Sequence, residues 1–206
     1  MTGDWLAESR TEAAADRILD AAEALFTERD PATIGMNEIA RAAGCSRATL
    51  YRYFDSREAL RIAYVHRETH RTGRQILQRI DGVQDPHERL VVGITETLRM
   101  VRNSPPLSAW FDVARVPIAG ELASRSDVIT AMVASFLGSS GPDDPATVQR
   151  RARWAVRVIV SLLMFPGADE AQERAMIEEF VAPVVVPNWG RHPRAGERES
   201  PYSVPE

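Results

Sequence analysis

The sequence predicts an all-α fold of about nine helices. Apolar residues recur at spacings of three and four along most of the chain, which is the period of an amphipathic helix. Glycine, proline and short polar clusters interrupt this pattern at roughly the length of one helix. Hydrophobic residues make up 44% of the 206 residues, which is enough for a core. No apolar run approaches the roughly 18 residues that a membrane helix needs.

The first predicted helix carries one apolar stripe over residues 18–26. It ends before Pro31, because proline disfavours helical backbone at the residue before it. The second helix is short, with apolar residues at helical spacing over 36–43. Gly44 follows it, at the position where a left-handed residue commonly ends a helix.

A third helix, over residues 47–53, begins after Ser46, which is a good N-cap. Leu50 and Phe54 fall on its buried side. Short helices with a tight turn between the second and third are the geometry of a helix-turn-helix, whose third helix enters the major groove of DNA. The outer face carries side chains that can donate hydrogen bonds to phosphates or base edges, namely Arg47, Thr49, Tyr51 and Tyr53.

A long fourth helix is predicted to run to about Ile80, with Asp55 and Glu58 resembling a capping box at its start. Arg57 and Arg61 lie one turn apart, where they can reach the flanking DNA backbone. The net charge of the chain is −4, yet residues 41–79 contain nine arginines and three acidic residues. A polyanion meets this local field rather than the net charge, so DNA remains the expected partner.

The segment 36–60, MNEIARAAGCSRATLYRYFDSREAL, strongly resembles the TetR family of bacterial transcriptional regulators. Its IA…AG-x-S…LY-x-x-F…EAL skeleton is intact, and residues 17–26 resemble the first helix of the family. The resemblance implies an N-terminal three-helix helix-turn-helix DNA-binding domain over 11–71. It also implies a C-terminal helical ligand-binding and dimerisation domain over 72–186. Residues 187–206 are polar and proline-rich, so we expect a disordered tail.

The chain departs from the family pattern just before the second helix. The family usually has a threonine there, which caps the helix and touches phosphate, whereas this chain has Gly35, with Thr33 two residues earlier. Glycine can still cap a helix, so the expected phosphate contact is lost or moves to Thr33. Tyr53 and Arg57 stand where the family favours histidine and lysine, and both keep hydrogen-bonding capacity. Thr33, Gly35 and Ser46 complete the predicted DNA-binding set.

The remaining helices are predicted near 86–102, around Trp110, and over 121–137, 146–164 and 169–182. The helix over 146–164 has two apolar stripes, so it must be covered on two sides. A central core helix in a monomer would satisfy this pattern, but the family resemblance implies that the last two helices form the four-helix bundle of a homodimer. The predicted dimer surface consists of Ala152, Val156, Ile159, Val160, Leu163, Ile177, Phe180, Val181 and Val184.

The resemblance also implies that the C-terminal domain encloses a cavity for a small-molecule effector. Aromatic and methionine side chains of the middle helices are candidates for its lining, although such residues are most often plain core. The predicted ligand-binding residues are Met100, Trp110, Phe111, Met132, Phe136, Trp154 and Arg157. Weaker candidates for polar lining groups are Thr95, Arg99 and Asn103.

We therefore expect a cytoplasmic repressor that binds a palindromic DNA operator as a homodimer, associates with the nucleoid, and is released by an apolar or aromatic ligand. The alternatives are an activating or ligand-independent regulator and, from another class, a small helical enzyme or a protein-interaction module. The sequence shows no nucleophile–base pair, carboxylate dyad or phosphate-binding glycine loop. We expect no cofactor, metal or membrane partner, with His66 and His70 on an exposed helix face and Cys45 in the core of the turn.

Overall fold

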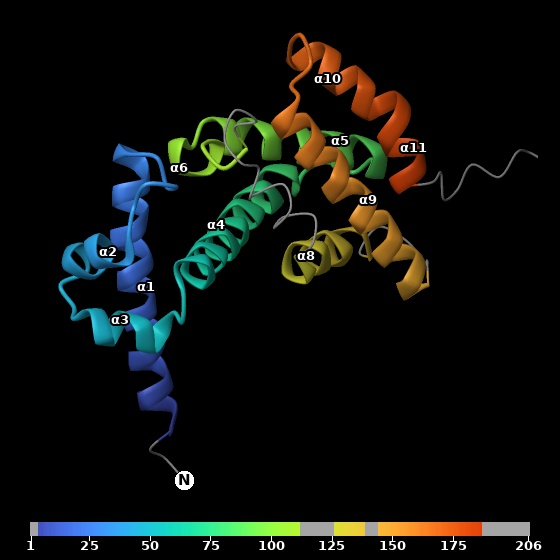
Figure 1. Ribbon diagram of the computed structural model, residues 1–206. Helices are drawn as coiled ribbons and strands as arrows, with labels where there is room; N and C mark the ends of the chain where they lie inside the picture. The colour runs from blue at the N-terminus through green and yellow to red at the C-terminus, as the bar shows by residue number, and fades with distance from the viewer. Residues whose placement is uncertain (1–3, 112–125, 139–143, 187–206) are drawn as a thin grey trace, which may run out of the picture.

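The computed structural model describes residues 4–111, 126–138 and 144–186, except for the side chains before residue 11. Every regular element in these ranges is helical, which confirms the predicted fold class (Figure 1). The elements are α1 (Asp4–Glu28), α2 (Met36–Ala42), α3 (Arg47–Tyr53), α4 (Arg57–Ile80), α5 (Pro86–Arg102), α6 (Pro105–Ser108), α8 (Asp127–Gly138), α9 (Pro145–Met164), α10 (Glu170–Met176), the π-helical segment η1 (Ile177–Val181) and α11 (Ala182–Val185).

The turn between α2 and α3 has the backbone that the sequence predicts. Gly44 has a φ of +67°, in the left-handed region. Ser46 then caps α3, because its Oγ accepts a hydrogen bond of 3.0 Å from the Thr49 N–H. The predicted cap of α4 is wrong by one residue: Ser56, not Asp55, accepts from the Ala59 N–H at 3.0 Å.

The core of the N-terminal unit includes a side chain from much later in the chain. Phe26 of α1 packs edge-to-face against Tyr64 of α4, with ring centroids 5.2 Å apart. Trp110, just after α6, packs against the same Phe26 ring at 6.0 Å. Trp110 is buried in this cluster together with Leu50 and Leu60. The N-terminal unit is therefore completed by the segment that follows α6.

The second core lies among α5, α8, α9, η1 and α11, at the other end of α4 (Figure 1). The short helix expected around Trp110 begins earlier, at Pro105, because proline is tolerated in the first turn of a helix. The described part of the helix expected over 121–137 is α8, and residues 121–125 lie outside the described ranges. The last predicted helix is widened into η1 just before Pro183, which has no N–H to continue the α-helical ladder.

Helix α4 crosses the predicted domain boundary at residues 71 and 72 without interruption. The boundary stays a prediction, and the helix connects the two cores directly. The tail predicted over 187–206 lies outside the described residues.

Candidate nucleic-acid interface and apolar cavity

The outer face of α3 presents a guanidinium stacked on a phenol ring. The Arg47 Cζ atom lies 5.4 Å from the centre of the Tyr51 ring, and both side chains are exposed. Arg52 lies over Tyr53 at the same distance of 5.4 Å. Tyr53, which was predicted on the outer face, is partly buried against the core of the N-terminal unit. Such stacked arginines keep their N–H donors free for phosphate oxygens or guanine edges while the ring limits their motion. This face can therefore bind DNA, as the sequence predicts.

The hydroxyls at the start of α3 bind each other. Ser46 Oγ and Thr49 Oγ1 lie 2.8 Å apart, in addition to the capping bond from the Thr49 N–H. Both residues therefore stabilise the first turn of α3. Their predicted contact with DNA stays a prediction.

The turn before α2 is held by its own residues. The Thr33 hydroxyl donates to the Asp30 carbonyl at 2.8 Å, and the Gly35 N–H donates to Glu38 Oε2 at 3.1 Å. Hydrogen bonds from Arg29 and from the Gly35 N–H lower the pKa of the Glu38 carboxyl. The Glu38 carboxylate thus takes the Gly35 donor that a phosphate would use, and the exposed Thr33 remains the candidate contact.

The structure corrects the prediction for Arg61. Its side chain is only 6% exposed and donates a hydrogen bond to the Pro31 carbonyl, because the first turns of α4 pack against the loop before α2. The guanidinium also lies 5.6 Å from the Trp110 ring centre. Burial, and then the neighbouring Arg57, lower the pKa of Arg61. Arg57 is exposed and donates to the Ala32 carbonyl at 3.3 Å, so it stays a candidate for a phosphate contact.

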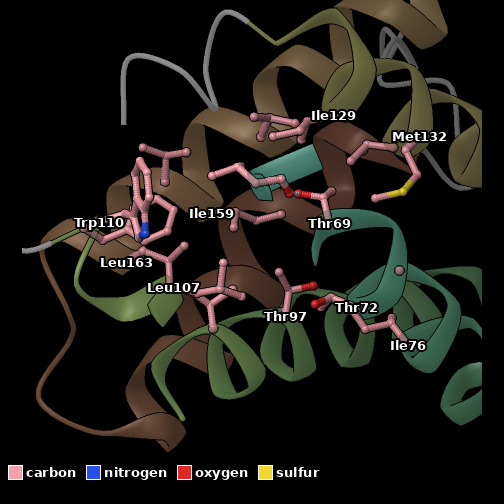
Figure 2. A pocket seen from close by; sticks show the side chains of 17 residues that line it. Thr69, Thr72, Ile76, Thr97, Leu107, Trp110, Ile129, Met132, Ile159 and Leu163 are labelled. Atoms are coloured by element: carbon pink, nitrogen blue, oxygen red, sulfur yellow. Dashed lines mark hydrogen bonds between the residues drawn. The ribbon is translucent and has the colours of Figure 1, made fainter. Parts of the chain in front are cut away.

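An apolar cavity of about 140 Å³ lies between α4, α5, the end of α6, α8 and α9 (Figure 2). Of the predicted ligand-binding residues, Trp110, Phe111 and Met132 line it. A second cavity of about 260 Å³ adjoins it and is lined by Met132 and Phe136. The structure thus brings together four of the seven predicted residues.

The other three lie elsewhere. Met100 lines a polar pocket between α4 and α5, together with Arg99 and Asn103. Trp154 and Arg157 are exposed on α9, on the side away from the first cavity. The polar candidate Thr95 uses its hydroxyl for the Val91 carbonyl at 3.0 Å and lines neither apolar cavity.

Sequence reasoning missed a set of lining residues on α4 and α5. The four residues on α4 recur at i, i+3, i+4 and i+7, on one face of the helix, and they include threonine and glycine. This pattern could have marked that face as the lining of a cavity. The missed residues are Thr69, Thr72, Gly73 and Ile76 of α4 and Thr97 of α5.

The structure also corrects much of the predicted dimer surface. The stripe of α9 that carries Val156 faces the cavity and the inner core, because it packs against α5 and α8. The predicted interface residues buried inside the single chain are Ala152, Val156, Val160, Ile177 and Val181. Ile159 and Leu163 are half-buried and line the cavity. Phe180 and Val184 alone of the predicted set are exposed, and the exposed apolar residues of α9 and its end are Trp154 and Phe165.

Among the residues that the structure describes, no group of three potential ligands is placed to hold a metal ion. His66 Nε2 lies 2.9 Å from Ser126 Oγ, and burial followed by the nearby His70 lowers the pKa of His66. Within the same residues, no helix combines the length and hydropathy that crossing a membrane requires.

Comparison with known proteins places this geometry in a family. The sequence model of the bacterial regulatory proteins of the TetR family matches residues 18–64. Two proteins of Mycobacterium tuberculosis, from strains CDC 1551 and H37Rv, are each 69% identical over 193 residues, which is 94% of this chain and 96% of theirs. Both are named as HTH-type transcriptional regulators.

Solved structures of low sequence identity share the fold. The TetR family repressor AlkX from a Dietzia strain has a TM-score of 0.65 at 24% identity, covering 82% of this chain and 96% of AlkX. The repressor QsdR of R. erythropolis has a TM-score of 0.64 at 23% identity, covering 84% of this chain and 95% of QsdR.

Proposed function

Because the chain belongs to the TetR family of bacterial transcriptional regulators, we propose that it is a repressor released from its operator by a small apolar or aromatic molecule. The helix-turn-helix makes it a DNA-binding regulator, and its relatives are named as regulators rather than enzymes. In the proposal, a homodimer binds a palindromic operator in the cytoplasm and leaves it when the apolar cavity is occupied.

The main support for this proposal is that Trp110 contacts both the N-terminal unit and the cavity. Its ring packs on Phe26 and Arg61 in the N-terminal unit, and it also forms part of the cavity wall. Helix α4 is shared in the same way, since Arg57 lies at the start of the helix while Thr69 and Ile76 line the cavity. A molecule in the cavity therefore presses on the two elements that position α3.

The DNA duplex fixes the distance between the two recognition helices of the dimer. A small displacement of these helices therefore leaves them unable to dock together. The ligand then favours the released form, and operator and ligand weaken each other's binding by the same factor.

Exposed apolar side chains support a homodimer. Phe180 of η1 and Phe165 after α9 are both 63% exposed, and Trp154 of α9 is 48% exposed. Large apolar side chains gathered on neighbouring elements are typical of a protein interface. Two-fold symmetry of such a dimer requires a palindromic DNA site.

The test begins with footprinting on the DNA that flanks the gene of this protein. We expect a protected palindrome, bound by the dimer and released on adding an apolar ligand, with higher expression from a reporter when the gene is deleted. A reporter that loses expression on deletion would make the protein an activator. Protection that no cavity ligand changes would make it a ligand-independent regulator.

A further inference from the structure

The two apolar cavities meet at a shared wall. Six residues line both of them: Gly73, Ile76, Thr97, Met132, Val133 and Ile159. From this wall the first cavity extends toward Trp110 and the second toward Leu90 and Phe136. Their volumes of about 140 and 260 Å³ are each below the roughly 300 Å³ of the smallest usual ligand pockets, but together they reach that range. A ligand of ordinary size has to occupy both.

Gly73 of α4 and Met132 of α8 face each other on the wall that the two cavities share. A Cβ atom on Gly73 would lie 3.0 Å from Met132 Sδ and 3.1 Å from its Cε. The missing side chain on α4 is therefore what leaves room for the thioether of α8. Methionine has three rotatable side-chain bonds, so the thioether can swing aside without a change in the backbone. Rotation of this one side chain would change the room available between the two cavities.

The lining selects an uncharged ligand. No charged residue is among the described residues that line either cavity. The hydroxyls of Thr69 and Thr97 donate to their own helices, to Val65 at 2.8 Å and to Gly93 at 2.7 Å. Thr72 brings a third hydroxyl to the cavity (Figure 2). An ionised group buried here would lose its water without gaining an opposite charge, which is strongly unfavourable.

We propose that the two cavities form one channel for an elongated, uncharged, largely aliphatic molecule, and that Gly73 and Met132 set the chain length that it accepts. This proposal rests on the proposed function, because the molecule would be the effector of the same regulator. It narrows that effector from any apolar molecule to one with a flexible chain.

The probes are methyl esters of straight-chain acids, from methyl butanoate to methyl dodecanoate, and the matching free carboxylates. Binding to the full-length protein is measured by isothermal titration calorimetry. We expect the affinity for the esters to rise about fourfold with each added methylene until the channel is full. Each carboxylate is expected to bind at least about tenfold more weakly than its ester.

Gly73→Ala tests this contact. Alanine is favoured over glycine inside a helix, so this variant is expected to fold. Because the new methyl group would lie 3.0 Å from Met132 Sδ, the thioether has to move away from α4, and we expect it to enter the space between the cavities. We expect short esters to bind as they do to the unchanged protein. The gain in affinity with each added methylene should stop at a shorter chain length than in the unchanged protein. The longest esters should then bind at least about tenfold more weakly than to the unchanged protein.

Gly138→Ala is the matched control. It makes the same change at the end of α8, where an added Cβ would meet no atom of the described residues outside its own turn within 4 Å. Gly138 lines neither cavity. This variant should keep the original dependence of affinity on chain length.

Three results would overturn the channel: affinity that does not depend on chain length, carboxylates that bind more tightly than esters, or equal truncation in both glycine variants. If phenol binds and releases DNA while the esters do not bind, the channel is wrong and the proposed repressor stands. If the esters follow the expected series while no DNA is bound, the channel stands and the proposed function fails. If no probe binds, the channel and the effector role of the cavity are both rejected.

Discussion

Arg61 and Trp110 show how one residue pair connects the two parts of the chain. The Arg61 guanidinium bonds to the Pro31 carbonyl and lies against the Trp110 ring. Within the described ranges, neither Arg61 Nε nor Trp110 Nε1 has a hydrogen-bond partner, although both atoms are buried. The contacts of the indole with these residues are therefore made by packing and by its ring face.

Trp110→Phe should weaken ligand release more than it weakens DNA binding. The smaller ring leaves space beside Phe26 and reduces the attraction to Arg61. We expect a loss of about 1–2 kcal/mol of stability, a nearly unchanged operator affinity, and a clearly higher ligand concentration for half-release. Fluorescence anisotropy on labelled operator measures both quantities. Val128→Ala, an exposed change on α8 outside both apolar cavities and the proposed dimer surface, is the control and should leave both unchanged.

Arg47→Ala should weaken operator binding by about 1–3 kcal/mol, because it removes the exposed guanidinium that stacks on Tyr51. The melting temperature should stay close to that of the unchanged protein, since Arg47 packs against nothing in the core. Arg150→Ala, which removes an exposed arginine of α9, is the control and should bind like the unchanged protein. Equal affinities for Arg47→Ala and the control in gel-shift titrations would reject α3 as the recognition helix.

At the scale of elements, one ion pair ties α5 to α10 and to the end of α9. Arg102 donates to both carboxylate oxygens of Glu173 at 2.7 Å and to the Leu162 carbonyl at 2.9 Å. The Gly167 N–H donates to Glu173 Oε1 at 2.8 Å. Glu173 is only 3% exposed, and the bond from Arg102 is the main cause of its lowered pKa. The pair holds the loop between α9 and α10 against α5.

Glu173→Gln should destabilise the protein by about 2 kcal/mol, because it leaves the Arg102 charge without its carboxylate. The Glu173 pKa is lower in the folded than in the unfolded protein, so its contribution is complete above the unfolded value of about 4.3. It is lost as the pH falls through the folded value, and the difference between the two proteins should therefore shrink in acid.

Urea denaturation at several pH values measures this difference. Glu178→Gln removes an exposed carboxylate that pairs with Arg174 at 2.7 Å on the same helical segment. This control should cost no more than about 0.5 kcal/mol, because such surface pairs contribute little. A Glu173→Gln protein as stable as the control would show that the buried pair does not hold α10 in place.

For the whole molecule, the exposed apolar side chains of α9, η1 and α11 are the proposed dimer surface. Phe180→Glu places a charge on this surface, where burial would leave it without a partner. Because Phe180 is 63% exposed in the single chain, folding should be unaffected. We expect a monomer in sedimentation velocity and at least about tenfold weaker operator binding, since two linked half-sites are lost.

Val128→Glu is the control for this change. Val128 is also an exposed apolar residue, but it lies on α8 rather than on the proposed interface. It should leave both sedimentation and operator affinity unchanged. A Phe180→Glu protein that remains dimeric would move the interface away from η1.

Features that depend only on neighbouring residues could be predicted from the sequence. Gly44 and Ser46 mark the turn before α3 because their conformations and caps involve only the adjacent turn. The helical period predicts the helices, and the motif over 36–60 resembles the family to which the chain belongs. Even the exposed face of α3 follows from the positions of Leu50 and Phe54.

Which apolar surface faces which neighbour could not be predicted from the sequence, because it depends on how the helices pack. Both stripes of α9 are apolar, so hydrophobicity could not show that Val156 faces inward and Trp154 outward. The sequence predicts Arg61 as a surface cation, but in the structure the loop at Pro31 and the ring of Trp110 cover it. In the sequence, Gly73 is one more glycine within a helix, and only the structure shows that Met132 lies opposite it. In each case the deciding partner is remote in sequence, and a local pattern carries no information about contacts that only packing creates.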